Sequence, residues 1–266
     1  MICAMFKNVL GVIPARLAST RFPGKLLKKI NGKPLIQLTY ENACASHRLE
    51  SVIIATDSQE IAEAAEAFGA EVIMTSDRCL NGTERIIEAF HSSDRLRQAD
   101  AIVNIQGDEP LLESSVIDAV VDCLERDHGA AVSTALIPLT DPERAQSTST
   151  VKAVFDLNHY ALYFSRSLIP GNKKGIFIPD IKYYQHLGIY AYRTSFLPEY
   201  AKMETTPLQE AEDLEQLKIL ERGYNMKITV VTSQSIGVDT PEDFKKVEKI
   251  LCKKNTSSSQ AESARP

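Results

Sequence analysis

Three cationic side chains and a hydroxyl follow the first apolar segment of the chain. Residues 8–15 (NVLGVIPA) end just before Arg16, and Ser19, Arg21 and Lys25 come soon after. Such donors at the end of a strand suit a triphosphate, because each charge-assisted contact offsets phosphate charge. A solvated basic loop is the alternative, since Lys and Arg are common on surfaces. The place of the loop, directly after a strand, favours phosphate binding.

Two common nucleotide-binding motifs are absent from this loop. It contains neither the GxxxxGK[ST] pattern of a Walker A loop nor the GxGxxG pattern of a dinucleotide turn. ATP hydrolysis of the usual type and NAD binding therefore lose their main support.

Carboxylates follow a later apolar segment in the same way. Residues 101–106 (AIVNIQ) lead into Gly107, Asp108 and Glu109. Mg²⁺ typically takes one or two carboxylates and completes its shell with water and substrate phosphates, so this position suits a magnesium site. The alternative is an acidic start to the helix that follows. Asp239, in GVDTPED, is either a second metal ligand or the cap of the last helix, and spacing alone leaves both open.

Other polar residues have equally plausible structural roles. Asp57 ends a second apolar strand, and Arg85 lies in an NGTER segment that opens a helix, where capping would explain both. His186, at the start of a strand, is more typical of a structural histidine when no partner is evident. No Ser/His/Asp or Cys/His signature is present, so the sequence does not favour covalent catalysis.

The elements that must position these residues alternate in the first half of the chain. Apolar runs of strand length are followed by helical patterns with plausible caps such as Ser58. The strands are predicted at 8–15, 51–56, 71–75 and 101–106, and the helices at 34–46, 58–68, 82–92 and 114–127. This order predicts an α/β fold with a mostly parallel sheet and helices on both faces. Ligands of such sheets bind at the carboxyl ends of the strands.

The alternation fails after residue 139. The strands expected in VKAVFD and HYALYFSR indicate a β-rich insertion at about 138–190, followed by a strand at 186–192. An amphipathic helix at 208–222, a strand at 226–232 and a last helix from Thr240 to about Lys253 complete a single domain, 1–253. The small polar residues of 254–266 predict a disordered tail.

Composition limits the classes of partner. The 266 residues carry a net charge of −5, so no global positive field exists to hold nucleic acid. No segment has the apolar length to span a membrane, and the first residues do not resemble an export signal. We therefore expect a cytoplasmic protein with neither a nucleic acid nor a membrane as partner.

Several blocks in register carry a resemblance to a known family. IPARLASTRFPGK, NGTER, QGDEP, ALYFSR, HLGIYAYR, LEQLK and GVDTPED occur in this order between about Val9 and Val247. Together they resemble the 3-deoxy-D-manno-octulosonate cytidylyltransferases, the CMP-Kdo synthetases of Gram-negative lipopolysaccharide synthesis. Asn81 departs from the pattern, because the family usually has Ser at this position.

The resemblance implies a fold, a reaction and a set of site residues. The fold is that of nucleotide-diphospho-sugar transferases, with the β-rich insertion in the contact of a homodimer. The reaction transfers CMP from CTP to the anomeric hydroxyl of Kdo, releases pyrophosphate and requires Mg²⁺. Of the site residues, Arg16, Lys25 and Asp108 would act in catalysis. The resemblance assigns CTP binding to Arg16, Ser19, Lys25, Ala55, Thr56, Asp57, Arg85 and Gln106, Kdo binding to Arg166, His186, Tyr190 and Gln216, with Glu215 and Lys152 as further candidates, and Mg²⁺ binding to Asp108 and Asp239.

Rival functions differ in sugar or in activity. CMP-sialate synthesis and nucleotidyl transfer to a sugar 1-phosphate use the same chemistry, and HLGIYAYR and ALYFSR favour Kdo over them. A non-catalytic nucleotide-binding domain is the rival from another class. Retention of Asp108 and Asp239 argues against it, because metal ligands are what such a domain could lose.

Overall fold

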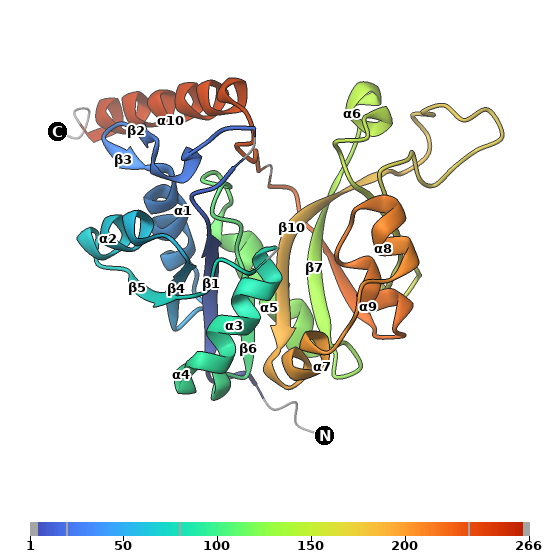
Figure 1. Cartoon of the computed structure of the whole chain (residues 1–266). Coiled ribbons are helices and arrows are strands. Elements are labelled where there is room, and N and C mark those ends of the chain that lie inside the picture. The colour runs from blue at the N-terminus through green and yellow to red at the C-terminus, as the bar shows by residue number, and fades with distance from the viewer. Residues whose placement is uncertain (1–4, 20, 80, 234, 263–266) are drawn as a thin grey trace.

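A mixed β-sheet of nine strands runs through the molecule (Figure 1). The computed structural model describes residues 5–262 except Thr20, Leu80 and Gln234, with side chains up to Lys253. The strands are β1 (Val9–Ala15), β2 (Lys29–Ile30), β3 (Lys33–Pro34), β4 (Ser51–Thr56), β5 (Glu71–Met74), β6 (Ala101–Asn104), β7 (Val132–Pro138), β8 (Lys152–Phe155), β9 (Ala161–Ser165), β10 (Tyr184–Arg193) and β11 (Met226–Val230). The main path of the sheet is β11-β7-β10-β6-β1-β4-β5, while β2 and β3 form a separate hairpin.

Helices cover both faces of this sheet. They are α1 (Leu35–Cys44), α2 (Gln59–Ala67), α3 (Gly82–Ser92), α4 (Asp94–Arg97), α5 (Ser114–Arg126), α6 (Pro142–Gln146), α7 (Leu197–Ala201), α8 (Pro207–Glu212), α9 (Leu217–Glu221) and α10 (Pro241–Glu262), with 3₁₀ turns η1 (Lys25–Leu27) and η2 (Thr194–Phe196). Residues of α1, α2, α5 and α10 share one core cluster, and residues of α3, α4, α7 and α9 share the other. The predicted α/β fold with two covered faces is confirmed.

Side-chain alternation along the strands divides the core into these two clusters. In β1, Leu10 and Val12 belong to the cluster that contains Phe90 of α3, whereas Ile13 belongs to the cluster that contains Ile36 of α1. Successive residues of a strand point to opposite faces, so a strand buried on both faces must be apolar throughout. All but one of the residues of β1 are buried, as the uninterrupted apolar run predicted.

Strand direction changes at β10. β4 and β6 pair parallel to β1, β5 pairs parallel to β4, and β11 pairs parallel to β7. β10 lies between β6 and β7 and is antiparallel to both, with an irregularity between Leu187 and Tyr190. The sheet is therefore mostly parallel, with one central reversal that joins its two halves.

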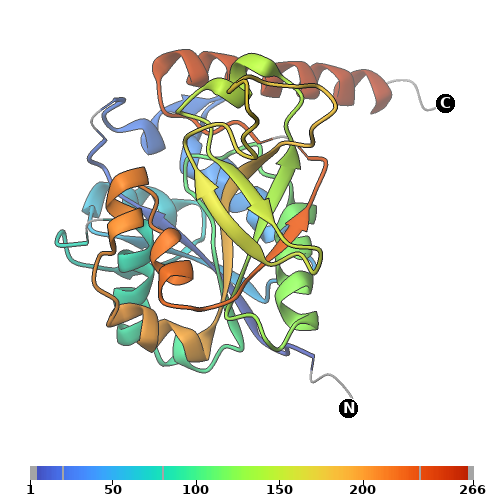
Figure 2. The ribbon, with the colours of Figure 1, turned by 90° about the vertical axis from the view of Figure 1, so that its right-hand side faces the viewer.

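A hairpin of β8 and β9 extends from the second half of the sheet. The two strands pair antiparallel to each other, and β8 touches β10 through Lys152 and Gln185. Figure 2 shows this hairpin, in yellow-green, in front of the second half of the sheet. The strands predicted in VKAVFD and HYALYFSR are confirmed.

Two predictions for helices are wrong. The helix predicted at 208–222 is two helices, α8 and α9, because Asp213 between them has a left-handed φ of 51°. The last helix does not stop near Lys253 but continues to Glu262, and residues 254–262 belong to it rather than to a disordered tail. Extending a helix already fixed by docked turns costs little compared with starting one. Residues 263–266 lie outside the described part of the chain.

Within the described residues, every helix is too short or too polar to span a bilayer.

Candidate active site

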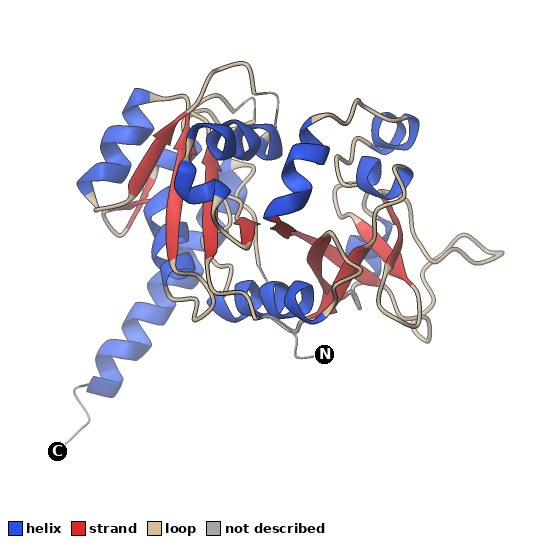
Figure 3. Ribbon diagram, turned by 90° about the horizontal axis from the view of Figure 1, so that it is seen from below, coloured by secondary structure: helices blue, strands red, loops and turns tan. Residues whose placement is uncertain are grey.

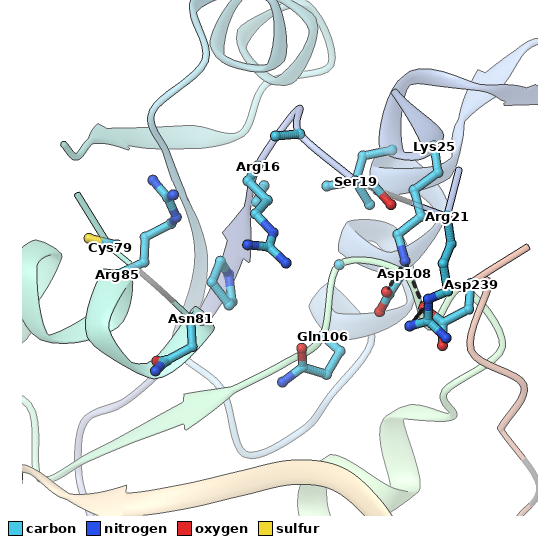
Figure 4. A pocket seen from close by; sticks show the side chains of 16 residues that line it. Arg16, Ser19, Arg21, Lys25, Cys79, Asn81, Arg85, Gln106, Asp108 and Asp239 are labelled. Atoms are coloured by element: carbon cyan, nitrogen blue, oxygen red, sulfur yellow. Dashed lines mark hydrogen bonds and ion pairs between the residues drawn. The ribbon is translucent and has the colours of Figure 1, made fainter. Parts of the chain in front are cut away.

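A cavity of about 320 Å³ opens at the carboxyl ends of β1 and β6 (Figure 4). The cavity therefore lies where ligands of such sheets are expected to bind, at the carboxyl ends of the strands. Its lining includes seven of the residues predicted for the site, namely Arg16, Ser19, Lys25, Arg85, Gln106, Asp108 and Asp239. It also includes Arg21, Cys79 and Asn81.

Lys25 lies between the two predicted metal ligands. Its ammonium donates to Asp108 Oδ2 at 2.5 Å, to Asp239 Oδ1 at 3.1 Å and to the backbone carbonyl of Val238 at 2.8 Å. Gly24, with a left-handed φ of 65°, makes the turn that begins η1 and brings Lys25 to this position. One cation therefore already holds together carboxylates from segments far apart in the sequence.

The two carboxylates meet because their loops are joined through the backbone. The N–H of Val238 donates to the carbonyl of Asp108 at 2.9 Å, which ties the segment after β11 to the loop after β6. Arg21 adds a second cation, with Nη2 2.9 Å from Asp239 Oδ1. Asp239 thus lines the cavity. The helix-cap alternative is wrong, because within the described residues the capping contacts at the start of α10 run between Thr240 and Asp243.

The donor set fits a magnesium ion. Two carboxylates with oxygens directed at one cation position are what Mg²⁺ takes from a protein, the rest of its shell being water and phosphate. Among the residues that the structure describes, no group of three or more His, Cys, Asp or Glu side chains is placed to hold a metal. A site that chelates a metal entirely through protein side chains is therefore not found in this part of the chain.

Glu109, next to Asp108, is a buried acid. Burial, followed by the charge of Asp108, raises the pKa of its carboxyl group to about 7. Its Oε2 is buried, with no hydrogen-bond partner among the described residues. The two adjacent carboxylates of QGDEP thus have different environments, and only Asp108 faces the cavity.

Arg16 and Ser19 present donors to the cavity. Arg16 follows β1 directly and is exposed, and Figure 4 shows its guanidinium pointing into the space between Gln106 and Lys25. No described residue forms a hydrogen bond or ion pair with it. An exposed guanidinium beside a half-buried ammonium suits an anionic ligand of several charges.

Arg85 is held by hydrogen bonds within the protein. It is 3% exposed, and its guanidinium donates to Thr75 Oγ1 at 2.6 Å and to Asp57 Oδ2 at 3.1 Å. These bonds tie the ends of β4 and β5 to α3. The predicted CTP-binding residues Ala55 and Thr56 are fully buried in β4 and do not belong to the described lining of the cavity.

The Gln106 carboxamide is oriented by its neighbours. Its Nε2 donates to the carbonyl of Gly188 at 3.1 Å and lies 3.4 Å from Asn104 Oδ1. The amide nitrogen is thereby directed toward β10, and in Figure 4 the amide oxygen points toward the cavity. Gln106 therefore offers an acceptor to a ligand.

Cys79 and Asn81 line the cavity and were missed by sequence reasoning as site residues. The Cys79 thiol donates to Glu88 Oε2 at 3.1 Å, and burial raises its pKa to about 11. Asn81 caps α3, its Oδ1 accepting from the N–H of Glu84 at 2.9 Å. A lone cysteine gives no sequence signal, whereas the position of Asn81 directly before a helix could have indicated that it lies at the cavity edge.

The residues predicted to bind the sugar lie in the other half of the sheet. None of Arg166, His186, Tyr190 and Gln216 belongs to the described lining of the cavity above. The rings of His186 and Tyr190 are 5.4 Å apart, and His186 Nε2 lies 3.0 Å from Thr134 Oγ1. Burial lowers the pKa of His186 to about 3, so its imidazole is neutral at physiological pH.

Arg166 is held apart from this pair. Its Nε donates to the carbonyl of Glu212 at 2.7 Å, and its Nη2 donates to the carbonyl of Asp213 at 3.0 Å. The structure thus brings His186 and Tyr190 together and places Arg166 at the end of α8.

Glu215 and Gln216 each have a buried polar atom without a hydrogen-bond partner among the described residues. Gln216 is 4% exposed, and its Nε2 has no partner among the described residues, nor has Oε2 of Glu215. Oε1 of Glu215 accepts from Thr83 Oγ1 at 3.1 Å, which links the segment just before α9 to the start of α3. The pKa of Glu215 is raised by burial.

Lys152, a further candidate for the sugar site, lies inside the protein. It is 0% exposed and its ammonium donates to three backbone carbonyls. Its three N–H bonds are therefore all used within the protein.

Comparison with known proteins agrees with this geometry. The family model described as "Cytidylyltransferase" matches residues 10–230. A 3-deoxy-manno-octulosonate cytidylyltransferase of Protochlamydia amoebophila is 50% identical over 252 residues, which cover 95% of this chain and 97% of the relative. The mitochondrial enzyme of that name from Arabidopsis thaliana is 49% identical, over 94% of this chain and 85% of the relative.

Solved structures give the same result. The structure of CMP:2-keto-3-deoxy-manno-octonic acid synthetase complexed with CTP is similar with a TM-score of 0.87 and 35% identity, covering 93% of this chain and 100% of that one. A cytidylyltransferase from Leptospira borgpetersenii, 19% identical with a TM-score of 0.60, shares the fold. The chain belongs to the cytidylyltransferase family and, within it, to the 3-deoxy-manno-octulosonate cytidylyltransferases.

Proposed function

We propose that this enzyme transfers CMP from CTP to the anomeric hydroxyl of Kdo and releases pyrophosphate. The observation that carries the proposal is the 50% identity, over 95% of the chain, to a relative named for this reaction. The product is an activated acid sugar, which we place in lipopolysaccharide synthesis.

The cavity at the ends of β1 and β6 is the proposed CTP site. Arg16, Ser19 and Lys25 bind the phosphates, and Gln106 contacts the cytidine, with Asp57 and Arg85 shaping the wall beside it. The proposal is supported by the exposed guanidinium of Arg16 at the strand end and by the lining that these residues share. A similar solved protein is described as complexed with CTP.

Asp108 and Asp239 are the proposed ligands of Mg²⁺. Bound there, the ion would neutralise phosphate charge and help to position the triphosphate. Lys25 contacts both carboxylates and would share in neutralising the phosphate charge beside them. The support is the convergence of two carboxylates on one cation position.

Arg166, His186, Tyr190 and Gln216 form the proposed sugar site, with Glu215 beside them. A buried polar atom normally has a hydrogen-bond partner, and Nε2 of Gln216 and Oε2 of Glu215 have none among the described residues. A ligand rich in hydroxyl groups would satisfy both. Arg166 supplies the positive charge that an acid sugar requires.

The reaction is an in-line displacement at phosphorus. The anomeric oxygen of the sugar forms a bond to the α-phosphorus of CTP and loses its proton to solvent, while the bond from that phosphorus to the bridging oxygen of pyrophosphate breaks. Negative charge gathers on the leaving pyrophosphate, where Arg16 and Lys25 stabilise it. Because the sugar hydroxyl attacks the phosphorus directly, the reaction needs no covalent enzyme intermediate.

We also propose that the enzyme is a cytoplasmic homodimer. Leu162 of β9 is 60% exposed and Ile176, in the loop that follows, is 49% exposed. Exposed apolar side chains gathered on one part of a surface are typical of an interface. Light scattering with size-exclusion chromatography tests this, with Leu162→Lys as the variant expected to shift the protein toward monomer. A monomeric wild type would contradict the dimer.

The product identifies the reaction. Incubation with CTP, Kdo and Mg²⁺ should yield CMP-Kdo by mass spectrometry and pyrophosphate in equal amount. Omission of the sugar should leave CTP intact. Release of phosphate or CMP without a CMP-linked sugar would contradict the proposal.

A further inference from the structure

Lys152 is a buried cation without an ion-pair partner in the described part of the chain. It begins β8, its exposure is 0%, and Nζ donates to the carbonyls of Ser147 at 2.8 Å, Thr150 at 2.7 Å and Arg166 at 2.5 Å. A buried ammonium is costly unless hydrogen bonds satisfy it, so this arrangement calls for an explanation.

The three bonds fix the chemical state of Lys152. An ammonium has three N–H donors, whereas a neutral amine has two, so three carbonyl acceptors are fully satisfied only by the charged form. Burial lowers the pKa of Lys152, and the nearby charge of Glu212 opposes that effect. No donor is left for a ligand.

The carbonyls belong to two segments that are separate in the sequence. Ser147 and Thr150 lie in the turn between α6 and β8, here called the 147–151 turn, and Arg166 directly follows β9. The N–H of Arg166 donates to Glu212 Oε2 at 2.8 Å. The backbone of Arg166 is therefore held at both of its polar groups: Lys152 binds its carbonyl, and Glu212 binds its N–H.

The guanidinium of Arg166 depends on the same turn. Its Nη1 donates to the carbonyl of Thr148 at 3.2 Å, and its Nε donates to the carbonyl of Glu212. Because Thr148 lies between two residues held by Lys152, the ammonium controls both the backbone of Arg166 and one acceptor of its side chain.

His186 rests on this turn as well. Its N–H donates to the carbonyl of Val151 at 2.9 Å, and its ring packs edge-on against Phe164 of β9, with centroids 4.9 Å apart. One ammonium thus underlies two of the residues assigned to the sugar site.

We propose that Lys152 is a positioning residue for the sugar: its ammonium fixes the 147–151 turn and the backbone of Arg166, and thereby the direction of the Arg166 guanidinium, without touching substrate. The inference rests on the proposed function, because it gives Arg166 an acid sugar to bind. According to this inference, Lys152 affects the affinity for the sugar through Arg166 and not by direct contact.

Lys152→Met tests this in the full chain, because Met keeps most of the unbranched side chain and removes the three donors. In a pyrophosphate-release assay, the KM for Kdo should rise about tenfold or more while the KM for CTP stays within about twofold. In an Arg166→Ala background the same substitution should change the KM for Kdo by less than about twofold, because neighbours that act as a unit are not additive.

Leu96→Ala is the matched control for lost stability. Leu96 is fully buried in α4, which lies at the opposite end of the strands from the cavity (Figure 1). It should lower Tm and leave both KM values unchanged. Lys152→Arg, which keeps the charge, should raise the KM for Kdo less than Lys152→Met, and it replaces Lys152→Met if that variant does not fold.

Hydrogen exchange separates failure of this inference from failure of the proposed function. Amides 147–152 and 166 should exchange faster in Lys152→Met than in the wild type, with the β1–β4–β5 region unchanged. If the wild type forms no CMP-Kdo, the proposed function fails. In that case the exchange of amides 147–152 and 166 alone tests whether Lys152 holds these segments in place. Unchanged exchange in these segments, or equal rises in both KM values, would overturn the inference.

Discussion

At the scale of single residues, charge explains the proposed phosphate end of the site. Lys25 and Arg21 together balance the two carboxylates Asp108 and Asp239. Arg16 adds a positive charge that has no ion-pair partner among the described residues. The residue types and their places after strands predicted the cationic loop and Asp108, whereas only the family resemblance favoured Asp239 as a metal ligand. The sequence could not show that Arg85 binds Asp57 and Thr75, because such contacts depend on how three elements pack.

Asp108→Asn should lower kcat/KM by about a hundredfold or more, because an amide replaces a charged metal ligand. Tm should change little, since Asp108 is partly exposed in the cavity. Pyrophosphate release and a thermal melt measure both effects. Asp122→Asn, at a surface ion pair with Arg48, serves as the control and should retain activity. Turnover of Asp108→Asn at the wild-type rate would remove Asp108 from the proposed metal site.

His186 should make the protein acid-sensitive. Because burial lowers its pKa to about 3, the unfolded chain takes up a proton below its ordinary pKa of 6.5 while the folded chain does not. This contribution to stability is therefore complete above pH 6.5 and is lost as pH falls, by about 1.4 kcal/mol per pH unit.

Urea unfolding measures this loss. Between pH 6.5 and 5, the stability of the wild type should fall by about 2 kcal/mol more than that of His186→Gln, which has no titrating ring. His47→Gln removes an exposed histidine and should behave like the wild type. Parallel pH curves for the wild type and His186→Gln would show that the His186 ring is not held neutral.

At the scale of elements, local signals predicted the starts of helices well. Ser58 and Asn81 cap α2 and α3 with hydrogen bonds to Ile61 and Glu84. The break at Asp213 could not be predicted, because residues 208–222 keep a helical apolar pattern with no Gly or Pro. The guanidinium of Arg166 takes the carbonyls of Glu212 and Asp213, which a continuous helix would use internally, so a contact distant in sequence decides this break.

Asn81 should be replaceable by Ser but not by Ala. Ser keeps an oxygen that can accept from the N–H of Glu84, whereas Ala leaves this donor without its cap at a cost of about 1 kcal/mol. Denaturant unfolding should thus rank Asn81→Ser close to the wild type and Asn81→Ala below it. Equal stability of all three proteins would mean that the cap has no energetic role.

At the scale of the whole molecule, one continuous sheet joins a proposed nucleotide half and a proposed sugar half. Figure 3 shows these two parts from below, with strands and helices in each. Alternating strands and helices predicted the first half closely. The reversal of β10 was not predictable, since an apolar run such as 186–192 does not reveal the direction in which a strand pairs. This reversal sets Tyr190 of β10 opposite Asn104 of β6. The first residues assigned to the sugar therefore lie on the strand next to β6, which leads into the proposed nucleotide site.

The most direct test of the account is pyrophosphate release with Mg²⁺ from CTP, UTP, ATP or GTP, each paired with Kdo, N-acetylneuraminate or a hexose 1-phosphate. EDTA provides the metal-free control. We predict release only from CTP with Kdo, and none with EDTA. Release with CTP and a different sugar would contradict the sugar assignment, and no release from any pair by folded protein would contradict catalysis itself.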